Sequence, residues 1–241
     1  MADKTGIEWT DATWNPVTGC TKVSPGCAHC YAETITLRFK RGGPFLPGKT
    51  TIRLHPDRLD DPGKWRSPRR VFVNSMSDLF HEEVPFEFIQ EVFDRMETHS
   101  SHTYQILTKR PERMLEYVVW SGYERWPDHI WAGVSVENQY WADRRIPLLR
   151  QVPSSVRFLS CEPLLKPLDL DLKGIHWVIV GGESGHRARK MEETWALGIR
   201  DQCEQTGVAF FFKQWGGRTS KSGGRALGGR IWNEMPLPHV V

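Results

Sequence analysis

Residues 70–96 read RVFVNSMSDLFHEEVPFEFIQEVFDRM, and this stretch predicts one β-strand followed by one α-helix. The run 70–74 is short, apolar and rich in valine, which is typical of a strand covered on both faces. After Pro85, which suits a first helical position, apolar residues recur at steps of three and four, the period of an amphipathic helix. A strand joined to a helix in this way is the building unit of parallel α/β sheets.

The same unit recurs along the rest of the chain. Five further short apolar runs are predicted strands, at 104–107, 130–136, 156–159, 176–180 and 208–212. Between them, helical periods open at Pro111 and span 141–149, where Pro147 predicts a kink or an early stop. A last helix carries Cys203 on its apolar stripe and ends at Gly207, so Cys203 is expected in the core.

Together these units predict a single α/β domain over residues 1–241. If 7–15 supplies a first strand, there are about seven βα units, which predicts a (β/α) barrel of the TIM type, full or partial. A doubly wound sheet stays open as an alternative, because a list of strands does not fix their order. Two basic, glycine-rich stretches, at about 40–70 and 216–230, interrupt the pattern and are predicted to be loops.

Composition limits the functional classes. The 241 residues are 39% hydrophobic and 25% charged, which is typical of a globular protein and excludes disordered, collagen-like and coiled-coil chains. No apolar run approaches the ~20 residues that cross a bilayer, and the N-terminus lacks a signal-peptide pattern, so we expect a cytoplasmic protein without a membrane partner. The net charge of +3 does not by itself indicate nucleic-acid binding.

Three of the five cysteines lie close together, at Cys20, Cys27 and Cys30, in a C-x6-C-x2-C array. Clustered thiolates in a chain without a disulfide framework are typical of zinc or iron–sulfur sites. Zinc needs a fourth ligand, and His29 sits between two cysteines, where it would be strained. Three cysteines without a fourth fit a [4Fe-4S] cluster that leaves one iron open, while a zinc loop or reduced structural thiols stay as alternatives.

This cysteine array beside the first strand of a βα barrel resembles the radical S-adenosylmethionine (SAM) superfamily. The commonest spacing there is C-x3-C-x2-C with an aromatic residue before the third cysteine. Here the first gap is six residues, and His29 takes the aromatic position, where its ring can stack on an adenine. The resemblance implies a [4Fe-4S] cluster on Cys20, Cys27 and Cys30, and SAM as the second cofactor.

The resemblance extends beyond the cysteines. With its motifs TGIEWTDATWNPVTGC, VNSMSDLFHEEVP, QILTKRPERM, VSVEN, FLSCEPLL, VGGESG and GGRIWNEMP, the chain resembles a phage and prophage family marked by a three-Cys motif. Several motifs also resemble radical SAM enzymes of the spore photoproduct lyase type, which repair a thymine dimer in DNA. Their S-x-T-D-P segment corresponds here to Ser75-Met-Ser77-Asp78-Leu.

Polar residues follow all six of the strands predicted from residue 70 onward, where the reactive groups of a βα barrel lie. Polar residues also collect at strand ends for solvation alone, so no single one of them demonstrates a site. The radical SAM resemblance implies cofactor-binding roles for some of them: the SAM ribose or methionyl group for Ser75, Ser77 and Asp78, the SAM carboxylate for Lys109, a further hydrogen bond for Ser135, and the methionyl amine or the substrate for Glu183.

Three residues are candidate catalytic groups. Glu162 directly follows a strand and is expected on the same rim as Glu183. Cys161 or Tyr31 is a candidate to return a hydrogen atom to a product radical, formed after a 5′-deoxyadenosyl radical abstracts hydrogen from the substrate. Packing in the core stays the alternative for Cys161, because an unpaired cysteine often behaves as a small hydrophobe.

The substrate is expected to be nucleic acid, DNA rather than RNA. Basic residues on the predicted loops, beside Trp65, Trp215 and Trp232, suit a phosphate backbone and a flipped base. We therefore expect an enzyme that isomerises, rearranges or repairs a modified pyrimidine in phage DNA, with an electron donor such as flavodoxin or ferredoxin. The alternatives are a radical SAM enzyme acting on RNA or a small metabolite, and a non-catalytic, metal-stapled nucleic-acid-binding protein.

Overall fold

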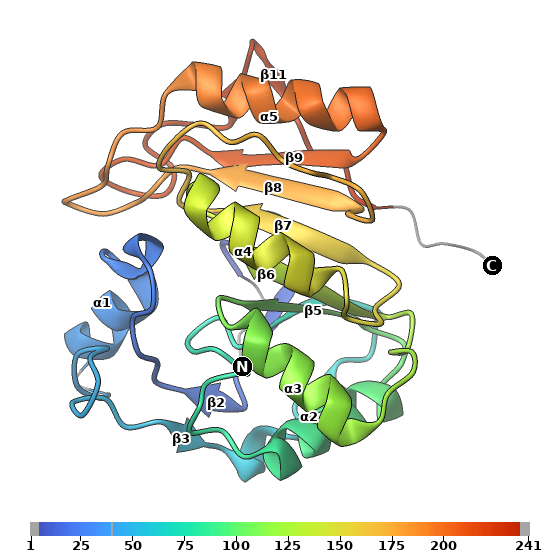
Figure 1. Ribbon diagram of the computed structural model, residues 1–241. Helices are drawn as coiled ribbons and strands as arrows, with labels where there is room; N and C mark the ends of the chain where they lie inside the picture. Colours follow the sequence, from blue (N-terminus) through green and yellow to red (C-terminus); the bar gives the residue numbers. More distant parts are fainter. Residues whose placement is uncertain (1–4, 40, 237–241) are drawn as a thin grey trace.

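A computed structural model, which describes residues 5–39 and 41–236, contains a seven-stranded parallel sheet (Figure 1). The strands are β1 (Ala12–Trp14), β4 (Arg70–Val73), β5 (Thr103–Thr108), β6 (Ile130–Ser135), β7 (Arg157–Cys161), β8 (Trp177–Gly181) and β9 (Ala209–Gln214). Their order in the sheet is their order in the chain, and every neighbouring pair is parallel. A doubly wound sheet requires a reversal of strand order, so that alternative is excluded.

The sheet is curled but open. Its two edge strands are β1 and β9, and no pairing joins them among the strands that the structure describes. The prediction of a barrel of the TIM type, full or partial, is therefore confirmed in its partial form. Because all neighbouring strands are parallel, their carboxyl ends lie at one side of the sheet. The arrows of β8 and β9 in Figure 1 point toward the side of the molecule that carries α1 (Tyr31–Arg38).

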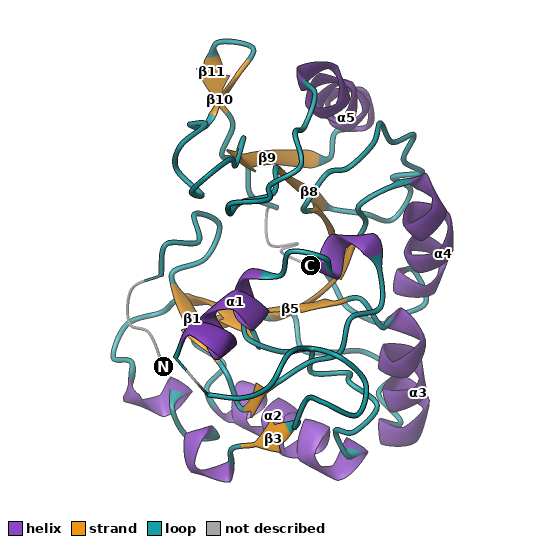
Figure 2. Cartoon of the chain, turned by 90° about the vertical axis from the view of Figure 1, so that its left-hand side faces the viewer, coloured by secondary structure: helices purple, strands orange, loops and turns teal. Residues whose placement is uncertain are grey.

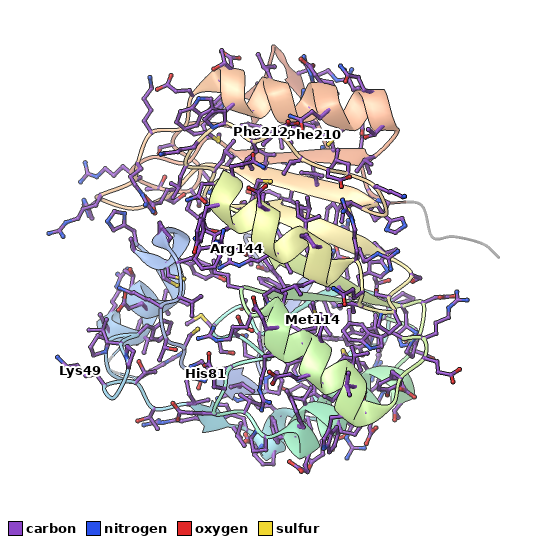
Figure 3. All side chains as sticks on the ribbon, in the orientation of Figure 1. Lys49, His81, Met114, Arg144, Phe210 and Phe212 are labelled. Atoms are coloured by element: carbon purple, nitrogen blue, oxygen red, sulfur yellow. The ribbon has the colours of Figure 1, made fainter. Side chains whose placement is uncertain are left out.

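Helices cover the outside of the curled sheet (Figure 2). They are α2 (Phe86–Thr98), α3 (Pro111–Ser121), α4 (Gln139–Leu149) and α5 (Glu193–Thr206). Outward side chains of the strands pack beneath them, as Phe210 and Phe212 do between β9 and α5 (Figure 3). Cys203 lies fully buried in this outer core, as predicted. None of the described helices is both long and apolar enough to cross a membrane.

Local differences from the sequence predictions concern the connections. The segment between β7 and β8 contains no described helix, so the strand–helix alternation fails there. Helix α4 continues past Pro147 to Leu149, two residues later. Two small two-stranded ladders involve the predicted loops. In the first loop, β3 (Arg53–Leu54) pairs with β2 (Val17–Thr18), which precedes that loop. In the second, β10 (Ala226–Leu227) pairs with β11 (Arg230–Ile231) at the end of the loop. Lys40, at the start of the first predicted loop, and residues 1–4 and 237–241 lie outside the described residues.

The inside of the curled sheet is filled by an aromatic plug, which we define as the buried cluster of Trp9, Phe72, Trp131, Val156, Phe158, Trp177, Ile179 and Phe211. Side chains alternate between the two faces of a strand, so these residues point inward while their neighbours point to the helices. Trp177 lies in edge-on contact with Trp9, Trp131 and Phe211, at ring-centroid distances of 6.0 to 6.2 Å. Apolar packing therefore fills the part of the interior away from the carboxyl ends.

We expect Trp177→Ala to lower the free energy of unfolding by about 3–5 kcal/mol, because it removes a fully buried indole from this plug. Urea unfolding followed by circular dichroism measures the change. Val119→Ala is the control, since 83% of Val119 is exposed and the expected change is within about 0.5 kcal/mol. Equal unfolding midpoints for the two variants would contradict the role of the plug.

Candidate functional site

The cysteine loop, residues 19–31, lies at the carboxyl ends of the parallel strands, with α1 following directly from it (Figure 2). We call this end of the curled sheet the mouth. The loop reaches the mouth through contacts that are distant in sequence: Gly26 N donates to Glu137 Oε1 (3.1 Å), and His29 Nδ1 lies 2.9 Å from Glu183 Oε2. These contacts fix the loop across the strand ends.

Three carboxylate–arginine pairs hold the cysteine loop, and they follow the alternate strands β4, β6 and β8. Asp78 pairs with Arg110 (3.2 Å), Glu137 with Arg145 (3.0 Å), and Glu183 with Arg189. All three carboxylates are buried. Each pair also touches the loop, because Arg110 donates to Thr21 O (3.1 Å), Glu137 accepts from Gly26, and Arg189 donates to Pro25 O (3.0 Å).

The Glu137–Arg145 pair is the most enclosed of the three. Glu137 is fully buried and Arg145 is 1% exposed. Arg145 also donates to Ser135 O (2.7 Å) and stacks over the Trp141 ring, yet its Nε and Nη2 groups are buried without a hydrogen-bond partner. Burial lowers the pKa of Arg145, and Glu137 opposes that effect. Neither charge would be tolerated there without the other.

The three thiols of the cysteine loop share one electrostatic neighbourhood. All three are free and partly buried, and burial, with a smaller contribution from the charge of Cys27, raises the pKa of both Cys20 and Cys30. Soft thiolates are the ligands that iron–sulfur clusters use, so this donor set fits a cluster. Among the described residues, no group of three His, Cys, Asp or Glu side chains is spaced to bind one metal ion.

Cations face these thiols. Arg110 Nη1 lies 3.7 Å from Cys20 Sγ. Burial opposes ionisation of Cys27, but Lys109 and backbone hydrogen bonds from Val23 and Ser24 outweigh it, so the pKa of Cys27 lies below its ordinary value. Burial, reinforced by Asp78, raises the pKa of Cys20 to about 12. The positive side chains therefore partly compensate the negative charge that ligating thiolates would bring.

Two residues predicted to bind a cofactor, Asp78 and Ser77, are hydrogen-bonded to other parts of the protein. Asp78 accepts from Thr108 Oγ1 (2.7 Å), Lys109 N (3.1 Å) and Phe80 N (3.1 Å) as well as from Arg110. Ser77 Oγ donates to Val17 O (2.8 Å). The side chains of Asp78 and Ser77, which belong to the turn after β4, thus already have hydrogen-bond partners inside the protein.

The same turn also presents groups toward the mouth. Ser75 Oγ donates to Asn15 Oδ1 (3.2 Å), and the Tyr31 hydroxyl donates to Ser75 O. Asn74 adopts a left-handed backbone conformation (φ 60°), which is uncommon for a residue other than glycine and is enriched at functional sites. Its Nδ2 group is buried without a hydrogen-bond partner. This turn therefore has unused hydrogen-bonding capacity.

Two pairs of polar side chains belong to the strands that border the mouth. Lys109 Nζ donates to Ser135 Oγ (3.1 Å), which joins the ends of β5 and β6. Lys213 Nζ lies 3.0 Å from Glu162 Oε1, which joins the ends of β7 and β9. Tyr31 is 49% exposed, and its hydroxyl reaches the turn after β4 by donating to Ser75 O.

The structure does not bring Cys161 to this group. Phe158 belongs to the inner plug and Cys161 to the outer core, three residues further along β7, so the Cys161 thiol faces the helices. The charge of Cys203 on α5 is among the causes that raise its pKa, after burial. This placement agrees with the alternative of a packing role.

Glu183 belongs to a Gly-Gly-Glu segment, whose glycines have a packing reason. A Cβ at Gly181 would clash with Glu162 Oε1, and a Cβ at Gly182 would clash with Trp215 O. The carboxylate itself accepts from Arg189 and from His29. The segment thus serves close packing of β8 against its neighbours and anchors the cysteine loop.

The sequence alone did not point to Arg110, Arg145 or Arg189. They stand 32, 8 and 6 residues from the carboxylates that they bind. Arg110 lies in the QILTKRPERM motif, but nothing in the sequence pairs any of the three arginines with its carboxylate. The carboxylates that follow strand ends were the only part of these pairs visible in the sequence. A buried carboxylate requires a partner, but the sequence does not say which residue provides it.

Comparisons with known proteins agree with the fold. A family model described as "Protein of unknown function (DUF5131)" matches residues 4–236. A search of the curated proteins gives no significant match. A solved structure described as "Spore photoproduct lyase complexed with dinucleoside spore photoproduct" is similar with a TM-score of 0.53 and 13% sequence identity, over 82% of this chain and 74% of that chain. The fold resemblance is confirmed, whereas the phage family and its three-Cys motif stay predictions.

We expect the stability of the protein to depend on the ionisation of Glu183. Burial would raise its pKa, but hydrogen bonds from Arg189 and His29 lower it to about 2, from an ordinary value of 4.5. A lowered pKa stabilises the fold above pH 4.5, and this contribution is lost as the pH falls toward 2. Relative to Glu183→Gln, the wild type should lose up to about 3 kcal/mol across that window.

Urea unfolding of both proteins at several pH values measures this difference. Glu124→Gln controls for the loss of one carboxylate, because Glu124 is exposed and precedes the amino end of β6. A wild-type advantage over Glu183→Gln that did not change with pH would contradict the ion pair.

We expect Arg145→Met to destabilise the protein by about 3–5 kcal/mol, because it leaves Glu137 buried and uncompensated. The double variant Arg145→Met/Glu137→Leu removes both charges and should be more stable than the Arg145 single variant. Urea unfolding of both single variants and the double variant completes the cycle. Additive effects of the two substitutions would show that the pair does not interact directly.

Proposed function

The chain belongs to the DUF5131 family, and from the geometry of the mouth we propose that it is a radical SAM enzyme that rearranges or repairs a modified pyrimidine in DNA. The observation that carries the proposal is the three-thiol loop fixed across the carboxyl ends of an open βα barrel. Reactive groups of βα barrels gather at that end. A loop of thiols held there by three buried carboxylates and their arginine partners is more than a packed core requires.

In this proposal Cys20, Cys27 and Cys30 hold a [4Fe-4S] cluster with one open iron. Lys109 and Ser135, which are hydrogen-bonded to each other, are available to a carboxylate or an amine of SAM. The unpartnered Nδ2 of Asn74, beside Ser75, is available to a ribose or methionyl oxygen. When bound, the two cofactors together supply a carbon-centred radical that abstracts hydrogen from a substrate.

The remaining residues of the mouth orient the substrate and protect the radical. The aromatic plug closes the interior below the mouth, which limits access of water from that side. The Lys213–Glu162 pair offers a cation and a carboxylate to the polar edge of a base. Tyr31 directly follows Cys30, and its hydroxyl donates to Ser75 O, which makes its phenol, rather than the outward-facing Cys161, our candidate hydrogen-atom donor.

A pyrimidine in DNA is the substrate that we favour. The structurally similar spore photoproduct lyase was solved with dinucleoside spore photoproduct, a substrate made of nucleosides. We propose that this chain acts on a related base in a phage DNA base-modification pathway, in the cytoplasm, with flavodoxin or ferredoxin as the electron donor. RNA or a small metabolite as substrate, and a metal-stapled protein without catalysis, remain the competing functions that the experiment separates.

Anaerobic reconstitution with iron and sulfide tests the enzyme class. We expect about four irons per chain and release of 5′-deoxyadenosine from SAM on reduction. Single substitutions Cys20→Ala, Cys27→Ala and Cys30→Ala should each abolish that release and lower the iron content. Cys203→Ala should retain both and lower only the stability, by about 1 kcal/mol, because Cys203 lies in the outer core.

Stoichiometric zinc with no cleavage of SAM would overturn the enzyme and favour the metal-stapled binding protein. Iron and 5′-deoxyadenosine release without any change in thymine-containing DNA, tested against matched RNA, would retain the enzyme class and overturn the substrate.

A further inference from the structure

A second concave site lies behind the turn that carries Ser75. It is a cleft of about 480 Å³ between the first residues of the cysteine loop and the segment 41–58. Asn15 and Met76 form part of its wall, and both belong to the hydrogen-bonded turn of Ser75, since Asn15 Oδ1 accepts from Ser75 Oγ and from Met76 N (2.9 Å). The cleft and the mouth are thus two sides of one turn.

The lining of this cleft is cationic. It includes Arg41, Arg53, Arg58 and His55, together with threonine hydroxyls, and it includes no carboxylate. No ion pair joins Arg41, Arg53 or Arg58 to an acidic side chain within the part of the chain that the structure describes. Because their charges are not neutralised inside the protein, these arginines are available to an anion. We call this site the cationic cleft.

The acidic side chains near the cleft do not cancel this charge. On α1, Glu33 already pairs with Lys22 (2.7 Å) and accepts from Phe45 N (2.9 Å). Burial, then Arg58 and Arg53, lower the pKa of His55, and the exposed Asp57 opposes them more weakly than the two arginines act. The local field at His55 is therefore positive.

The cleft is built against the cysteine loop. Gly19 has a left-handed conformation (φ 91°), and a Cβ there would clash with Thr51 O, which lines the cleft. His55 Nε2 lies 2.8 Å from Thr18 Oγ1, and Arg58 donates to Asn15 O (3.3 Å). An anion bound in the cleft would contact residues directly preceding Cys20.

An exposed aromatic ring lies next to these cations. Phe39 is 55% exposed, and the guanidinium groups of Arg41 and Arg38 lie 5.3 and 5.7 Å from its ring centre. Arg41 thus belongs both to the cleft and to this ring. Lys49, at the outer edge of the same segment, extends away from the sheet (Figure 3). Cations beside an exposed aromatic ring are typical of surfaces that bind single-stranded nucleic acid.

We infer that the cationic cleft binds a backbone phosphate of the nucleic-acid substrate, while Phe39 stacks on a base that flanks the target. This inference rests on the proposed function, and it adds the site that holds the strand outside the mouth. The volume of the cationic cleft is within the range of about 300–1,000 Å³ that is usual for ligand sites. Phosphate contacts set the register of a strand, so the cleft would position the target base at the mouth.

Binding of a short fluorescein-labelled single-stranded oligothymidylate to the full chain, followed by anisotropy at several salt concentrations, tests the inference. For Arg41→Gln/Arg53→Gln we expect Kd to rise about tenfold at low salt, and the salt slope to fall by about 0.7 for each lost phosphate contact. Phe39→Ala should raise Kd without changing that slope. Arg125→Gln is the matched control, since Arg125 is exposed near the amino end of β6 and pairs with Asp128.

Oligonucleotides that carry a single neutral methylphosphonate linkage identify the phosphate without altering the protein. One position should weaken binding to the wild type and have no further effect on Arg41→Gln/Arg53→Gln. Unchanged affinity and salt slope in the arginine variant would overturn the inference. Tight binding of inorganic phosphate that the oligonucleotide does not displace would also overturn it, in favour of a small-anion site.

The outcome is separable from that of the proposed function. Iron content and 5′-deoxyadenosine release without DNA depend on the cysteines and should be unchanged in Arg41→Gln/Arg53→Gln. Loss of DNA binding with those two properties intact supports the cleft. Absence of SAM cleavage in every variant would overturn the enzyme and leave the binding result standing.

Discussion

Three buried carboxylate–arginine pairs are the constraint on which the site depends. Asp78, Glu137 and Glu183 follow alternate strands, and each pairs with an arginine. In every pair, one of the two side chains also forms a hydrogen bond with the cysteine loop. Buried charges are costly unless they are paired, and removal of one partner is costlier still. The pairs therefore tie the position of the loop to the position of the strand ends, and loss of either partner is expected to destabilise both.

The inside of the curled sheet has two parts, an apolar part and a polar part at the mouth. Below, the aromatic plug excludes water and fixes the curvature through edge-on contacts among large rings. Above, Lys109, Ser135, Glu162 and Lys213 border the mouth in two hydrogen-bonded pairs. Among the described strands β1 and β9 do not pair, so the curled sheet stays open between these two edges.

The sequence predicts what is local and misses what is distant. Short apolar runs in the sequence predict strands β4 to β9. The sequence did not exclude a doubly wound sheet, because the order of the strands depends on contacts between runs that are distant in sequence. Helix α1 was missed because Thr34, Ile35 and Thr36 are β-branched and only Ala32 and Thr36 are buried, which leaves no apolar period. The direction of Cys161 was unreadable for a related reason. Both faces of β7 are covered, so no polar alternation distinguishes inside from outside.

The same reasoning explains why a net charge of +3 is uninformative for this chain. An arginine that is paired inside the protein contributes to the total but not to binding, as Arg110, Arg145 and Arg189 illustrate. Arg41, Arg53 and Arg58 contribute the same formal charge, yet they line a cleft without carboxylates. Both sets of arginines count equally toward the net charge. Affinity for a polyanion depends instead on arginines that no carboxylate neutralises, such as those of the cleft. Pairing, rather than composition, thus decides where an anionic strand can be held.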